Sequence, residues 1–149
     1  MKKRNILIAI AFITTCAAVY GFIEYNRVAK DLIYVKAKFT VSAEAIMESF
    51  AKDELKANKQ YLGRVVAVSG NIRAIEATDK NNSILVLGDE TSLSSVRCSL
   101  DSTHMNVLQN LHTGEKVTVK GIITGYNADE TGLLGSDIQM NRCIINSKK

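Results

Sequence analysis

Residues 65–74 read VVAVSGNIRA and residues 116–123 read KVTVKGII, and these two stretches decide the fold class. In both, apolar side chains recur at every second position, which is the period of a β-strand with one buried face. Each stretch also has a glycine in its interior, Gly70 and Gly121. Glycine weakens a strand unless the strand bends sharply or a neighbour approaches closely, so we interpret both as structural glycines of a strongly curved sheet.

Three further strands are predicted, at residues 84–87, 96–100 and 136–145. Between the third and fourth strands, apolar residues at helical spacing predict a short helix: Met105, Val107, Leu108 and Leu111. Three strands, a helix and two strands is the order of the five-stranded OB-fold, a small barrel. The predicted fold class is therefore all-β, with an OB-fold domain over residues 61–149.

Upstream of these strands the apolar period changes to that of a helix. Ser42 is suited to cap a helix that continues to about Lys59. Its apolar stripe consists of Ala43, Ile46, Met47, Phe50, Leu55 and Ala57. We expect residues 42–60 to pack on the barrel as one amphipathic helix, with partner binding as the alternative role. Residues 24–41 are expected to form a stalk.

The N-terminus carries an apolar run without a charge from Ile6 to Ile23, preceded by Lys2, Lys3 and Arg4. As a helix this run would span roughly 27 Å, just enough to cross a bilayer. We expect residues 1–23 to be an uncleaved signal anchor, with a single pass through the cytoplasmic membrane and the C-terminal domain outside. Lipid modification at Cys16 and cleavage after Ala17 are the two alternatives.

The distribution of charged residues along the chain indicates whether the domain is suited to bind nucleic acid. Of the formal net charge of +4, the whole excess lies N-terminal: residues 1–59 hold 10 Lys/Arg against 6 Asp/Glu, and residues 60–149 hold 9 against 9. From residue 60 onward the only aromatic residues are Tyr61 and Tyr126. Single-stranded nucleic acid needs a basic groove and aromatic platforms, so nucleic-acid binding is not expected.

Several short segments carry a resemblance to a known family. They are FTVSAE (39–44), KDE (52–54), ANKQYLGR (57–64), VSG (68–70), VRC (96–98), GEKVTVKG (114–121) and NRC (141–143). With them, the chain resembles the tRNA-anticodon-binding-like OB-fold family of bacterial exported proteins over most of residues 25–146. The resemblance implies the OB-fold and an exported, membrane-anchored location, and it carries no activity over to individual residues.

No constellation for catalysis, cofactor binding or metal binding is found. His104 and His112 lie eight positions apart without Cys or carboxylate partners at ligand spacing, and the glycines do not form a phosphate-binding loop. We therefore expect no enzyme activity, no cofactor and no metal.

Two cysteines on predicted neighbouring strands, Cys98 and Cys143, are a candidate disulfide in an exported domain. The alternative is that both are buried free thiols. Met140 and Cys143 lie three positions apart, so both can face the core only if a bulge forms near Asn141 and Arg142.

These observations predict a membrane-anchored OB-fold binding or interaction module with a protein partner. The alternative is an OB-fold domain that binds an oligosaccharide or a nucleic acid. A concave site with convergent polar groups on the barrel face between residues 76–82 and 127–135 would favour the alternative, whereas a flat apolar patch would favour a protein partner.

Overall fold

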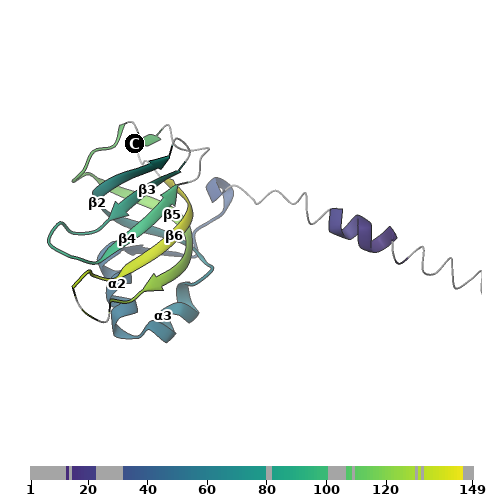
Figure 1. Cartoon of the computed structure of the whole chain (residues 1–149), viewed down its shortest axis with the longest axis horizontal. Helices are drawn as coiled ribbons and strands as arrows, with labels where there is room; N and C mark the ends of the chain where they lie inside the picture. The colour runs from purple at the N-terminus through teal and green to yellow at the C-terminus, as the bar shows by residue number, and fades with distance from the viewer. Residues whose placement is uncertain are drawn as a thin grey trace, which may run out of the picture. The chain divides into compact units, whose positions relative to one another are not determined.

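The computed structural model divides the chain into two units, Met1–Lys30 and Asp31–Lys149 (Figure 1). The residues that it describes are 13, 15–22, 32–79, 82–100, 107–108, 110–129, 131 and 133–145.

In the first unit, Ile13 and residues 15–22 are helical, with exposed side chains. The remainder of the apolar run, and the segment from residue 24 to Lys30, lie outside the described residues. Among the residues described, no helix is long and apolar enough to cross a membrane.

The second unit is built around five long strands, all close to the predicted positions. They are β2 (Val65–Asp79), β3 (Asn82–Leu87), β4 (Ser95–Leu100), β5 (Lys116–Asn127) and β6 (Asp137–Ile145). The sheet order is β2-β3-β4-β6-β5, and pairing of β5 with β2 closes the barrel. Only β4 and β6 pair in parallel among these five. The predicted five-stranded barrel, consistent with the OB-fold, is thereby confirmed.

A sixth strand was not predicted. Strand β1 (Phe39–Ser42) pairs in parallel with the first half of β2, from Phe39 opposite Val66 to Ser42 opposite Ser69. A 3-10 turn, η1 (Leu32–Tyr34), precedes it and buries Leu32. The described residues 32–41 therefore belong to the barrel unit and not to a stalk, because they supply a strand partner and apolar side chains to it.

The predicted single helix is in fact two, α2 (Ala43–Lys52) and α3 (Glu54–Tyr61). Ser42 caps the first helix as expected, accepting a hydrogen bond from the Ala45 N–H. The first helix ends at Asp53, whose backbone is extended and not helical. The Asp53 side chain accepts a hydrogen bond from the Lys56 N–H and so caps the start of α3. Aspartate favours such a cap over a helix interior. Leu55, predicted on the apolar stripe, is 77% exposed as a result.

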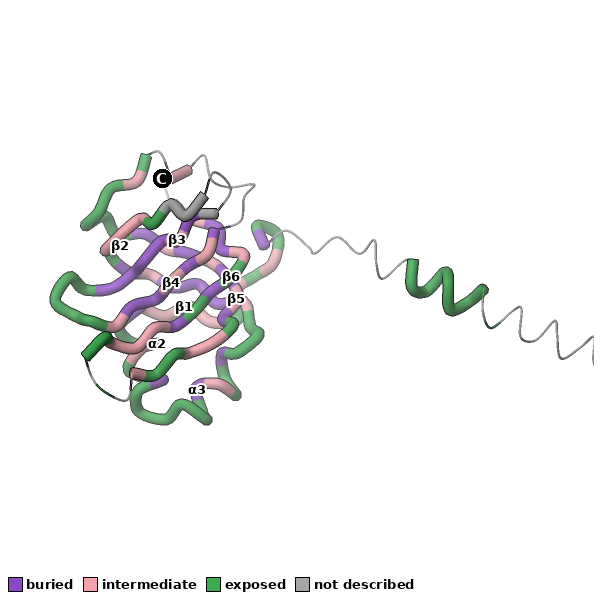
Figure 2. Tube along the Cα trace, viewed as in Figure 1, coloured by how far each residue is buried: buried purple, intermediate pink, exposed green. Residues whose placement is uncertain are grey.

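The core lies inside the barrel and under α2 and α3, and Figure 2 shows the buried residues along the strands. Aromatic rings join the helices to the sheet. The ring centroid of Phe50 lies 4.9 Å from that of Tyr126 and 6.1 Å from that of Tyr61. The rings of Phe39 and Tyr61 meet edge to face, with their centroids 5.3 Å apart. Tyr61 and Tyr126, the two aromatic residues from residue 60 onward, are thus used for packing.

Of the short helix predicted between the third and fourth strands, only part is described. Val107, Leu108 and Asn110 form a 3-10 turn, and Leu108 and Leu111 pack against the core. The beginning of this segment, including Met105 and His104, lies outside the described residues.

Candidate functional site

The outer face of β3, β4 and β6 carries an open hollow of about 240 Å³. Its lining consists of Ile84, Arg97, Ser99, Gln139, Met140 and Asn141. Strand alternation explains the polar lining, because Val96, Cys98 and Leu100 face the core and leave the intervening residues of β4 outside. The hollow therefore brings hydrogen-bonding side chains of two parallel strands together on the side of the sheet that faces solvent.

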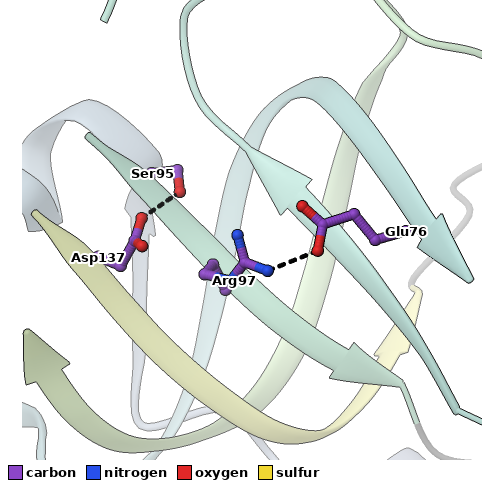
Figure 3. A network of polar contacts seen from close by, with 4 residues as sticks. All are labelled: Glu76, Ser95, Arg97 and Asp137. Carbon is purple, nitrogen blue, oxygen red and sulfur yellow. Dashed lines mark hydrogen bonds and ion pairs between the residues drawn. The ribbon is translucent and has the colours of Figure 1, made fainter. Parts of the chain in front are cut away.

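Arg97, the cation of this hollow, is already paired. Its Nη2 lies 2.5 Å from Oε2 of Glu76 on β2, and the two side chains are 31% and 45% exposed (Figure 3). An exposed ion pair of this kind contributes only about 0–1 kcal/mol to stability. Its consequence here is electrostatic, since the carboxylate offsets the positive charge that Arg97 would otherwise present to a ligand.

The ends of the two parallel strands are fixed by a second polar contact. Ser95, which is buried, donates its hydroxyl proton to Asp137 Oδ1, and the Ser95 N–H donates to the Ser136 carbonyl at 3.0 Å (Figure 3). A buried hydroxyl needs such a partner. The contact holds β4 and β6 in register beside the hollow.

A β-bulge at the other edge of the hollow interrupts β6. Met140 pairs with Cys98 and Cys143 with Leu100, so β6 has one residue more than β4 over this interval. Arg142 takes up the extra residue with φ 55°, a left-handed conformation that is uncommon outside glycine. Because of the bulge, Met140 and Cys143 are both fully buried.

Cys98 and Cys143 are free thiols in the structure, on neighbouring strands. Contact with Cys98 and burial raise the pKa of Cys143 well above its usual value, so its thiol stays protonated. The disulfide stays a prediction for the protein under oxidising conditions.

Both structural glycines lie where another residue approaches closely. A Cβ on Gly70 would lie 3.0 Å from the Cβ of Ala43 and 3.4 Å from that of Leu87, so the close neighbours are α2 and β3. Gly70 also marks the point at which β2 passes from its pairing with β1 to its pairing with β3. A Cβ on Gly121 would lie 2.5 Å from Cys143 Sγ.

The polar residues of the hollow were not singled out in the sequence. The signal that could have found them is the period-2 pattern itself, because Arg97, Ser99 and Gln139 alternate with core residues of predicted strands. Glu76, within the range 76–82 that borders the barrel face considered from the sequence, lies on β2. Among the described residues no group of three or more His, Cys, Asp and Glu side chains could hold a metal ion.

The family model tRNA_anti-like matches residues 1–137. A search of curated proteins gave no match. A structure described as a "putative nucleic acid-binding lipoprotein" from Klebsiella pneumoniae has a TM-score of 0.55 at 16% identity, over 81% of this chain and 100% of that one. At this identity the likeness shows the fold alone.

Two more distant structures also align. Asparaginyl-tRNA synthetase from Pyrococcus horikoshii gives a TM-score of 0.40 at 18% identity, covering 58% of this chain and 20% of that one. An OBody bound to hen egg-white lysozyme gives a TM-score of 0.42 at 19% identity, covering 60% of this chain and 88% of that one. Since the family model spans most of the sequence, the chain belongs to the tRNA_anti-like family.

Proposed function

We propose that this chain is a membrane-anchored OB-fold module that binds a neutral, hydroxyl-rich ligand, an oligosaccharide, on the outer face of β3, β4 and β6. The observation that carries the proposal is the hollow with its convergent polar side chains. In OB-folds the face of the second and third barrel strands receives oligonucleotides and oligosaccharides, and the hollow lies on the third barrel strand, β4, between Ile84 of β3 and the residues of β6. No catalytic step is part of the proposal.

The chemistry of the lining favours a sugar over a nucleic acid. Ser99, Gln139 and Asn141 offer uncharged donors and acceptors, which match sugar hydroxyl groups. The positive charge of Arg97 is offset by Glu76, whereas phosphate binding needs cations that are free to replace counterions. Tyr61 and Tyr126 pack against Phe50 and so do not form a stacking platform for bases.

A binding experiment with matched variants tests the proposal. The full chain in neutral-lipid nanodiscs is titrated with chitotetraose, with a peptidoglycan disaccharide and with a thymidine oligonucleotide. We expect saturable binding of a sugar, weakened at least about tenfold by Gln139→Ala and unchanged by Gln60→Ala, the same substitution on α3. Binding of the oligonucleotide with a steep salt dependence would contradict the proposal. So would sugar binding whose affinity is unchanged by Gln139→Ala.

Anchoring and location form the second part of the proposal. The support is the uncharged run of residues 6–23 behind Lys2, Lys3 and Arg4, which fits an uncleaved anchor with the barrel outside the cytoplasmic membrane. We expect the protein to resist alkaline extraction from bacterial membranes, to be digested by protease added to spheroplasts, and to retain its N-terminal residues in an intact mass measurement. A chain that begins with a lipid-modified Cys16 would instead establish the lipoprotein alternative.

A further inference from the structure

Three exposed leucines lie on two loops at one end of the barrel. Leu93, on the loop between β3 and β4, is 58% exposed, and Leu133 and Leu134, on the loop between β5 and β6, are 76% and 85% exposed. The two loops lie side by side, because Gly135 packs its backbone directly on that of Leu93 and the Ser136 N–H donates to Ser94 Oγ at 3.0 Å. We call Leu93, Leu133 and Leu134 the leucine surface; it lies apart from the lining of the polar hollow.

The backbone under the leucine surface is held by many hydrogen bonds. The Asp129 carboxylate accepts from the N–H groups of Thr131, Leu134 and Gly135 at 2.6–2.9 Å, and from the Thr131 hydroxyl. These bonds keep the pKa of Asp129 far below its usual value, with the Thr131 hydroxyl as the largest contributor. From β2, Arg73 donates to the Ser92 carbonyl at 2.6 Å. Both loops thus present their leucines to solvent from a fixed backbone.

The surroundings of the leucine surface are acidic. The described residues of the two loops and their ends include the acids Asp89, Glu90, Asp129 and Asp137, and the cation that contacts them is Arg73 of β2, so negative charge is in excess. An apolar group within a negative field is suited to a partner that carries apolar side chains next to positive charges. The same field repels an anionic lipid surface and a second copy of these loops.

Within the barrel unit, the leucine surface lies away from the first described residues of that unit. The chain enters the barrel unit beside the end of β6, where Lys120 Nζ donates to the carbonyls of Ile33 and Val35 at 3.1 and 3.0 Å and Lys120 pairs with Ile144. The leucine surface lies where β6 begins, at Asp137, close to Ser95. It is therefore at the far end of the strand from the entry of the chain.

We propose that the leucine surface docks a partner protein through a segment in which apolar side chains are flanked by lysine or arginine. This inference concerns a surface other than the polar hollow, so it does not depend on the ligand proposed there. Leucine side chains would supply the buried contact, and the acidic residues would steer the basic flanks.

The experiment selects ligands from a random phage-displayed peptide library on the full chain in phosphatidylcholine nanodiscs, after removal of peptides that bind empty nanodiscs. We expect the selected sequences to combine aliphatic or aromatic residues with Lys or Arg. Synthetic versions should lose at least about tenfold in affinity with Leu133→Ser/Leu134→Ser and with Glu90→Lys, and should weaken as salt is raised. Leu55→Ser is the matched control, because Leu55 is 77% exposed on α3.

Each other outcome overturns the inference. Failure to select peptides, selection of sequences without basic residues, or binding that survives the double leucine variant would each exclude this partner chemistry. Two chains per nanodisc, reduced to one by Leu133→Ser/Leu134→Ser, would instead assign the surface to self-association. The thermal midpoint of every variant is measured, and the Glu90→Lys variant keeps the leucines intact, so a loss of folding in one variant does not decide the result.

Discussion

Gly121 on β5 and Cys143 on β6 are packed so closely that a Cβ on the glycine would lie 2.5 Å from the cysteine Sγ. The bulge at Arg142 turns Cys143 into the core at this point, and the missing side chain of Gly121 leaves room for its sulfur. The bulge in β6 and the missing side chain of Gly121 on β5 together allow the Cys143 sulfur to pack in the core.

The first prediction tests this pair. Gly121→Ala should lower the free energy of unfolding by about 1–3 kcal/mol through overpacking against Cys143. Cys143→Ala should remove most of that penalty in the double variant, so the two effects should be far from additive. Denaturant midpoints of the four proteins measure the coupling. Additive effects would show that the thiol is not what excludes the methyl group.

Gly70 gives a second prediction. Gly70→Val should destabilise the domain by about 1–3 kcal/mol, because its Cβ would press on Ala43 at the start of α2. Valine favours strands in general, so an unchanged or raised unfolding midpoint would argue against this contact between β2 and α2. Asn71→Val, one residue later on β2, is a control at an exposed position.

The extent of the domain can be tested by truncation. Residues 31–149 should fold and remain soluble without the N-terminal unit, since contacts divide the chain at Lys30. Residues 61–149, the domain predicted from the sequence, should fail to fold cooperatively, because they lack Ile46 and Phe50, which are fully buried in the core. Circular dichroism melting curves of both fragments check this; a cooperative transition for the shorter one would contradict it.

The loop of the leucine surface should respond to pH through Asp129. A carboxylate whose pKa is lowered in the folded state stabilises that state above its unfolded pKa, near 4, and the contribution is lost as the pH falls toward the folded value. Hydrogen exchange at Leu134 and Gly135 should therefore be slower in the wild type than in Asp129→Asn at about pH 6. The difference should shrink below about pH 4. An equal difference at every pH would show that the charge on Asp129 does not hold the loop.

Local patterns account for what the sequence could predict. The five barrel strands follow from the alternation of apolar residues, and Ser42 as a cap follows from its side chain. Strand β1 has only four residues and depends on a partner that begins 26 positions later, at Val65, so its pattern is too short to distinguish it from a stalk. The pattern does not indicate the break between the two helices at Asp53, because apolar residues continue at helical spacing beyond it.

The site was harder to predict because it depends on register. Arg97 meets Glu76 only after β2, β3 and β4 have paired, and no spacing along the chain indicates that contact. The bulge was foreseen as a condition for burying both Met140 and Cys143, and the structure meets that condition.

The most direct test of the proposed function maps a ligand onto the barrel by nuclear magnetic resonance. Isotope-labelled residues 31–149 are titrated with the sugar that binds the full chain, and the side-chain amide signals of Gln139, Asn141 and Gln60 are followed. The account predicts saturable shifts at Gln139 and Asn141 with none at Gln60. Shifts that spare Gln139 and Asn141, or that a thymidine oligonucleotide produces in place of the sugar, would contradict it.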